Sequence, residues 1–109
     1  MKGLLALALA SGVAAHPALK VSPATAHAGA KVTVSGNAGM CPRGDQVVAI
    51  SKAFPGHAYG QGTLSGKVGA GGAFSFAGHL RSGVKAGRYA VTARCGGGNL
   101  GVVAYVRVR

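Results

Sequence analysis

The chain has 109 residues, with twelve Lys and Arg side chains against one acidic side chain, which gives a formal net charge of +11. The one carboxylate, Asp45, excludes hydrolysis by paired carboxylates, and no Gly-x-Ser-x-Gly sequence offers a nucleophile for a catalytic triad. These features predict a protein that is not an enzyme and that uses no cofactor.

Residues 1–15 have the features of a cleaved secretion signal. Lys2 supplies a positive charge before an apolar stretch of about a dozen residues, shorter than the ~20 that span a bilayer, and residues 13–15 are small. An uncleaved membrane anchor is the alternative. We predict cleavage after Ala15 and a secreted, extracellular domain over residues 16–109 without a transmembrane segment.

After the signal, short segments of alternating apolar and polar residues are separated by Gly and Pro, which is typical of β-strands and turns. No segment shows the period of an amphipathic helix. Strands at this spacing favour an all-β, two-sheet sandwich with antiparallel pairing. In chain order, the seven predicted strands cover residues 19–21, 31–36, 46–51, 63–68, 73–76, 88–95 and 102–108.

The apolar phase of these strands predicts a core shared by the two sheets, formed by Val34, Ile50, Phe76, Tyr89 and Val91. Tyr89 also begins a late strand just after a corner in the chain. This position is typical of a tyrosine corner, in which the ring enters the core and the hydroxyl bonds to nearby backbone. A ligand contact is the alternative role for Tyr89.

Cys41 and Cys95 are the two cysteines, and they lie 54 positions apart, so they do not form a Cys-x-x-Cys motif. A metal pair or a redox motif is the alternative to a structural disulfide. Export provides an oxidising compartment, and a domain of this size has a modest core that a cross-link would stabilise by ~2–4 kcal/mol. We therefore predict a Cys41–Cys95 disulfide.

His16 would become the N-terminal residue after cleavage, and an N-terminal His can bind Cu(II) through its amine and ring nitrogen. The alternative is that His16 follows the cleavage site by chance, and we favour this reading. His27, His57 and His79 are isolated in or near predicted turns, where exposed histidines are expected. No metal site is predicted, and His16 is the one candidate ligand.

The basic side chains are scattered along the chain, and none belongs to a run of four or more. Nucleic-acid binders commonly cluster their charge or interleave it with aromatic residues, so no specific nucleic-acid binding is expected. A compositional bias on solvated strand faces explains the pattern. The charge also favours adhesion to anionic surfaces, of which cell-wall polymers are the candidate partner.

A series of positions runs through almost the whole mature chain: Leu19-x-Val21-x-Pro23, Gly29, Val32-x-Val34-x-Gly36, Cys41-x-x-Gly44, Gly72-x-Phe74 and Gly87-x-Tyr89-x-Val91-x-Ala93-x-Cys95-Gly96. This series resembles the immunoglobulin-like domains common in secreted proteins of actinobacteria. The resemblance implies an immunoglobulin-like sandwich whose disulfide joins the loop after the second strand to the end of the sixth, and it implies no catalytic residues. The series is more distantly similar to the neocarzinostatin-type chromophore carriers, which have two disulfides.

The sequence thus predicts a seven-stranded immunoglobulin-like antiparallel β-sandwich with one disulfide. Its predicted function is that of a secreted, non-enzymatic structural or interaction module, retained at the anionic cell envelope by its basic surface. The alternative is a carrier of a small molecule or of copper, which would use the Cys41/Cys95 loop end or the N-terminal His16.

Overall fold

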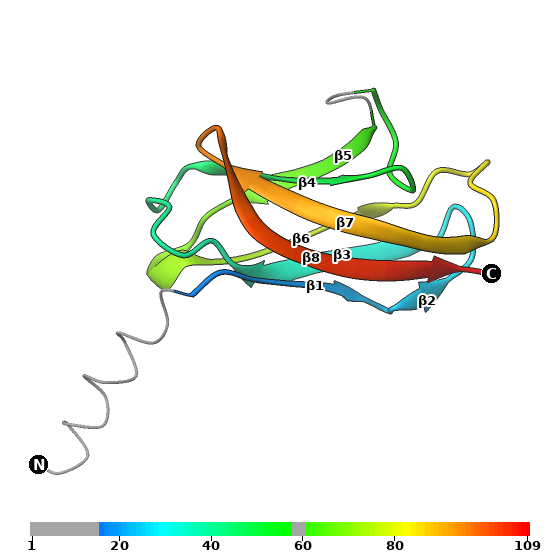
Figure 1. Ribbon diagram of the computed structural model, residues 1–109, viewed down its shortest axis with the longest axis horizontal. Coiled ribbons are helices and arrows are strands. Elements are labelled where there is room, and N and C mark those ends of the chain that lie inside the picture. The colour runs from blue at the N-terminus through cyan, green and yellow to red at the C-terminus, as the bar shows by residue number, and fades with distance from the viewer. Residues whose placement is uncertain (1–15, 58–60) are drawn as a thin grey trace, which may run out of the picture.

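The computed structural model describes residues 16–57 and 61–109, and it is a sandwich of two β-sheets (Figure 1). The predicted signal at residues 1–15 lies outside the described residues. The three-stranded sheet has the order β1-β3-β6, and the five-stranded sheet has the order β2-β8-β7-β4-β5. The strands are β1 (Ala18–Ser22), β2 (Thr25–Ala26), β3 (Lys31–Asn37), β4 (Gln46–Ser51), β5 (Gly62–Lys67), β6 (Ala73–His79), β7 (Gly87–Cys95) and β8 (Gly98–Val108), with a 3-10 turn η2 (Ala70–Gly72) before β6.

The predicted all-β sandwich is confirmed, with one strand more than the seven expected. The chain leaves the three-stranded sheet at Ser22, passes Pro23 and joins the other sheet through the two-residue strand β2. β2 pairs in parallel with β8, with Thr25 opposite Arg107. Two residues are too few for alternation to be seen in a sequence, which is why β2 was not predicted. The part of the chain that the structure describes contains no helix long and apolar enough to cross a membrane.

The core lies between the two sheets and consists mainly of small and β-branched side chains. Val34 and Val91 are fully buried there, as predicted. Phe76 and Tyr89 are only half-buried and pack against the edge of the core. The prediction for Ile50 is wrong: Val47, Ala49 and Ser51 of β4 are its inward-facing residues, so Ile50 is buried on the outer face of the five-stranded sheet.

Phe76 is half-buried because it spans the open side of the sandwich. From β6 in one sheet it lies against Gly66 of β5 in the other sheet, so closely that a Cβ atom at Gly66 would be 2.6 Å from the Phe76 ring. The Phe74 ring stacks on Phe76 with centroids 5.7 Å apart, and Phe74 is the more deeply buried of the two. The Phe pair therefore holds the two sheets together along this side.

Phe54 is a core residue that the strand pattern did not predict, because it follows β4 in an irregular segment. Its side chain is fully buried. The Ser51 hydroxyl accepts the Ala53 N–H at 3.1 Å, and the Phe54 N–H reaches the Ser51 carbonyl at 3.1 Å, so the chain turns inward immediately after β4. Gly62 permits the return path, since a Cβ atom there would overlap the Phe54 carbonyl.

Candidate functional site

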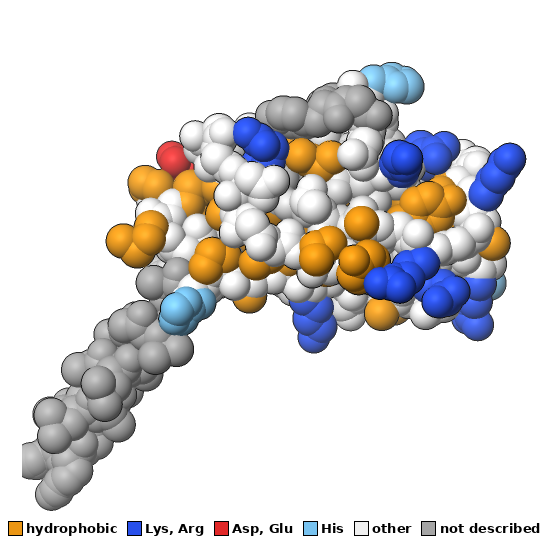
Figure 2. Space-filling view, viewed as in Figure 1, with side chains coloured by type: hydrophobic (Ala, Val, Ile, Leu, Met, Phe, Trp, Pro, Cys, Tyr) orange, Lys and Arg blue, Asp and Glu red, His pale blue; other side chains and the backbone are white. Residues whose placement is uncertain are grey.

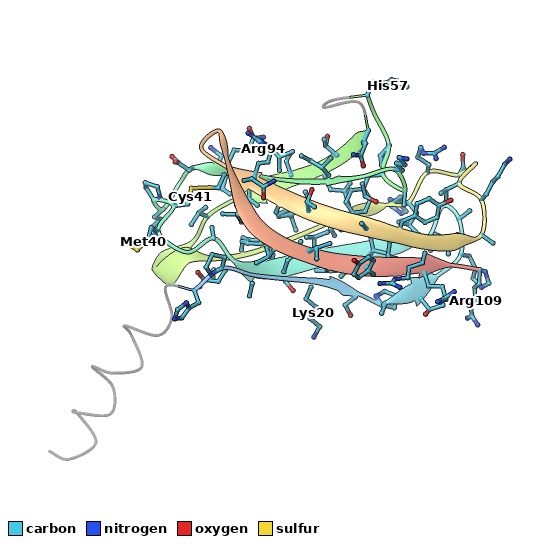
Figure 3. All side chains as sticks on the ribbon, in the orientation of Figure 1. Lys20, Met40, Cys41, His57, Arg94 and Arg109 are labelled. Carbon is cyan, nitrogen blue, oxygen red and sulfur yellow. A yellow bond between two sulfur atoms is a disulfide. The ribbon has the colours of Figure 1, made fainter. Side chains whose placement is uncertain are left out.

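A disulfide between Cys41 and Cys95 closes one end of the sandwich (Figure 3). It joins the loop after β3 to the last residue of β7, the connection that the family resemblance implied. The Asp45 carboxylate lies 3.6 Å from the Cys41 sulfur. In the described residues, Cys41, Asp45 and Cys95 are the group of three potential metal ligands close enough to share an ion. Both sulfurs are committed to the disulfide, so this group is not a metal site.

A shallow hollow of about 390 Å³ opens at the same end, between the loop after β3 and the β7–β8 hairpin. The disulfide forms part of its wall, together with Met40, Pro42 and Leu100. The Met40 side chain is 87% exposed and is the most exposed large apolar side chain in the described part of the molecule. This hollow is the feature of the structure that corresponds to the carrier site predicted at the Cys41/Cys95 loop end.

All four histidines are exposed. His16 does not belong to the Cys41–Asp45–Cys95 group, which is the group of three potential metal ligands found within the described ranges. His57 lies on the opposite side of the molecule from Lys20 of β1 (Figure 3). The hypothesis of copper binding at His16 thus rests on the cleavage site that the sequence predicts.

Tyr89 is half-buried at the opposite end of β7 from the disulfide, and its ring packs against the core. Its hydroxyl donates a hydrogen bond of 2.7 Å to the Lys85 carbonyl, four residues upstream. This contact has the form of a tyrosine corner, and it fixes the loop that leads from β6 into β7.

We expect Tyr89→Phe to lower the free energy of unfolding by about 0.5–1.5 kcal/mol, because the variant loses one hydrogen bond while the ring keeps its packing. Urea unfolding at neutral pH measures this loss. Tyr105→Phe is the control, since its hydroxyl sits on an exposed ring. Equal losses for the two variants would show that the Lys85 contact does not stabilise the corner.

The outer face of the five-stranded sheet carries the most distinctive surface. Alternation along β7 places Arg88, Ala90, Thr92 and Arg94 there, opposite the inward-facing Val91, Ala93 and Cys95. β8 contributes Val103, Tyr105 and Arg107, of which Val103 is 50% and Tyr105 44% exposed. The Arg88 guanidinium carbon lies 3.8 Å from the centre of the Tyr105 ring, a cation–π contact.

The pairing of β7 with β8 brings two arginines together on this face. Arg88 is directly opposite Arg107, and the next outward pair is Ala90 with Tyr105. A hollow of about 420 Å³ lies beside Arg88 and is also lined by Lys52 and Gln61. Arg88 and Lys52 therefore share one hollow, and Arg107 is the cross-strand neighbour of Arg88.

Charge is unevenly distributed over the molecule. Figure 2 shows Lys and Arg gathered over the half that carries the C-terminus, and the acidic side chain at the other end. Arg109 marks the C-terminal end and Cys41 the disulfide end in Figure 3. The segment between β6 and β7, which contains Arg81 and Lys85, also lies at the C-terminal end (Figure 1). We call this region, defined by Lys52, Arg81, Lys85, Arg88, Arg107 and Arg109, the basic end.

The scattered sequence positions of the basic residues concealed this region. Arg88 and Arg107 are nineteen positions apart by their numbers and belong to different strands, so no run of charge links them. The hairpin turn at residues 96–97 predicts that the two strands pair, but counting outward from it places Arg88 opposite Tyr105 instead of Arg107, because the register shifts between Thr92 and Arg94.

Comparison with known proteins supports the fold. No protein-family profile matches the sequence, and no curated protein is significantly similar to it. Among solved structures, the chain is similar to macromomycin, a neocarzinostatin-family apoprotein, with 18% identity, a TM-score of 0.60 and coverage of 85% of this chain and 99% of that one. It is also similar to the Pseudomonas fluorescens alkylpurine DNA glycosylase AlkC, solved bound to DNA containing an abasic site analogue, with 23% identity, a TM-score of 0.54 and coverage of 86% of this chain.

These likenesses establish a neocarzinostatin-like sandwich and no more. The sequence identities of 23% and 18% are low, and a shared fold does not by itself imply a shared function. The match spans only 29% of the glycosylase chain. A function for this protein has to come from its own surface.

Proposed function

We propose that the chain is a secreted, non-enzymatic immunoglobulin-like binding module that is held to anionic polymers of the cell envelope. The observation that carries the proposal is the separation of charge: the basic end faces away from Asp45, which lies beside the disulfide at the other end. Such a distribution gives the molecule a strongly cationic pole that anionic surfaces attract.

Attraction of this kind is weakened by salt, because the screening length falls to about 8 Å at physiological ionic strength. We expect the mature protein, residues 16–109, to sediment with wall fragments rich in phosphate polymers at low ionic strength and to be released by NaCl. Bovine serum albumin, an acidic protein, serves as the sedimentation control. Protein that stays in the supernatant at low ionic strength would contradict the proposal.

The second candidate is a carrier, and the hollow at the disulfide end is the observation that favours it. Its volume of about 390 Å³ lies within the usual range for small-ligand sites, and Met40 adds exposed apolar surface to it. Copper binding at His16 is a separate form of the carrier hypothesis, tested by calorimetric titration of the mature protein with Cu(II). Weak, non-stoichiometric binding of Cu(II) would exclude copper carriage at His16.

A further inference from the structure

Arg88 and Arg107 form an arrangement that costs folding stability. Residues directly opposite on antiparallel strands have their Cβ atoms about 4.5–5.5 Å apart, and like charges at such positions repel each other. Both side chains are exposed on the same face of the sheet. No carboxylate side chain is near enough to offset the repulsion, because Asp45 belongs to the disulfide end. A cation pair without an acidic side chain beside it is suited to binding an external anion.

The local backbone creates this pair. Near the turn, Arg94 faces Asn99, and continuing that register would place Arg88 opposite Tyr105 and leave Arg107 beyond the start of β7. A bulge in β8 shifts the register so that Arg88 faces Arg107. Gly101 has the positive φ of +77° that such a bulge requires, and the Asn99 side chain accepts the Gly101 N–H at 2.7 Å. The bulge therefore determines which charges meet.

Tyr105 prepares one of the two arginines for binding. With the Arg88 guanidinium 3.8 Å from its ring centre, the side chain is held over the sheet rather than free in solvent. A cation that is already in place loses less conformational entropy when an anion binds. Lys52, across the adjacent hollow, extends the cationic region away from the pair, so a chain with more than one anionic group can follow it.

The geometry favours phosphate over carboxylate and over nucleic-acid bases. Arginines at directly opposite positions can both donate to one tetrahedral phosphate group, whose oxygens point in different directions, whereas a carboxylate has two oxygens in one plane. Single-stranded nucleic acids depend on free aromatic surface for stacking, and Arg88 covers a face of the Tyr105 ring. The ligand that fits is a phosphate chain without aromatic bases.

We propose that Arg88 and Arg107, with Arg88 positioned by Tyr105, form a binding site for the phosphate groups of a phosphodiester-linked polymer that carries no aromatic bases. This inference rests on the proposed function, since it names the polymer class and the residues through which the module would be retained. It also makes a claim of its own, which is that binding is centred on one pair of side chains rather than spread over the net charge.

The test is a titration of the mature protein with short poly(glycerol phosphate), followed by NMR of the arginine Nε–Hε groups and by calorimetry. We expect the largest shifts at Arg88 and Arg107. The variant R88Q/R107Q should bind at least about tenfold more weakly, as loss of two charge-assisted contacts predicts. The control K20Q/R43Q removes the same charge, from the outer side of β1 and from the loop before β4, and should bind within about threefold of wild type.

Equal weakening by the two double variants, or shifts spread evenly over all basic residues, would overturn the pair as the site. Tighter binding of a single-stranded DNA of equal charge, or of poly-glutamate, would overturn the ligand class. Arg107→Thr adds a stability readout, because it removes the repulsion and leaves the Arg88–Tyr105 contact. Its melting temperature at low ionic strength should equal or exceed that of wild type while phosphate binding weakens. A lower melting temperature would assign Arg107 a structural role instead.

The outcome also separates this inference from the proposed function. Wild-type protein that binds poly(glycerol phosphate) at the Arg88–Arg107 pair but does not sediment with wall fragments would support the site and refute retention at the envelope. If R88Q/R107Q and K20Q/R43Q both sediment with wall fragments as well as the wild-type protein does, the site is refuted and charge-based retention stays in place.

Discussion

Phe54→Ala is expected to lower the free energy of unfolding by about 3–5 kcal/mol, a large fraction of the total stability of a domain this size. Phe54 is fully buried, and the segment around it is fixed by the Phe54 N–H bond to Ser51, the Ala53 bond to the Ser51 hydroxyl and the Thr63 bond to the Pro55 carbonyl. The neighbouring backbone therefore has little freedom to close the cavity that the phenyl ring would leave.

Chemical denaturation of the purified mature protein measures this effect. Phe76→Ala is the matched control, because it removes the same side chain from a half-buried site and should cost less. If Phe54→Ala proves too unstable to purify, Phe54→Leu keeps part of the volume and should still be less stable than wild type. Phe76→Ala proving more destabilising than Phe54→Ala would show that the open side of the sandwich, rather than the segment after β4, dominates the core.

Reduction of the Cys41–Cys95 disulfide is expected to lower stability by ~2–4 kcal/mol, since the bond closes a loop of 54 positions in the unfolded chain. Melting curves with and without reductant provide the measurement. Native protein should also be about 2 Da lighter than the reduced chain and unreactive toward thiol reagents. Free thiols in exported protein, or unchanged melting in reductant, would contradict a stabilising disulfide. Because the basic end lies at the other end of the sandwich, reduced protein that remains folded should still bind phosphate polymers.

The parts of the fold that sequence reasoning captured depend on clear alternation. β3 and β7 alternate apolar and polar residues, and Val34 and Val91 are accordingly buried. In β4, residues 47–50 are all apolar, so alternation could not decide which phase faces inward, and Ile50 was assigned to the wrong face. Phe54 lies where no period exists, and its burial depends on hydrogen bonds of the segment after β4.

The basic end could not be predicted for a different reason. Its residues come from separate strands and loops, and the meeting of Arg88 with Arg107 depends on the bulge at Gly101. Counting outward from the turn without the bulge gives the wrong partner for Arg88. A glycine two residues after an asparagine in the second strand of a hairpin was the local signal, but it does not specify the size of the shift.

The most direct test of charge-based retention is the dependence of poly(glycerol phosphate) affinity on salt concentration. The slope of log K against log[NaCl] reports how many counterions are released on binding, which is close to one for each phosphate contact. Wild type should show a steep negative slope, R88Q/R107Q a slope shallower by roughly 1–2, and K20Q/R43Q a slope near that of wild type. An affinity that does not change with salt would contradict the account.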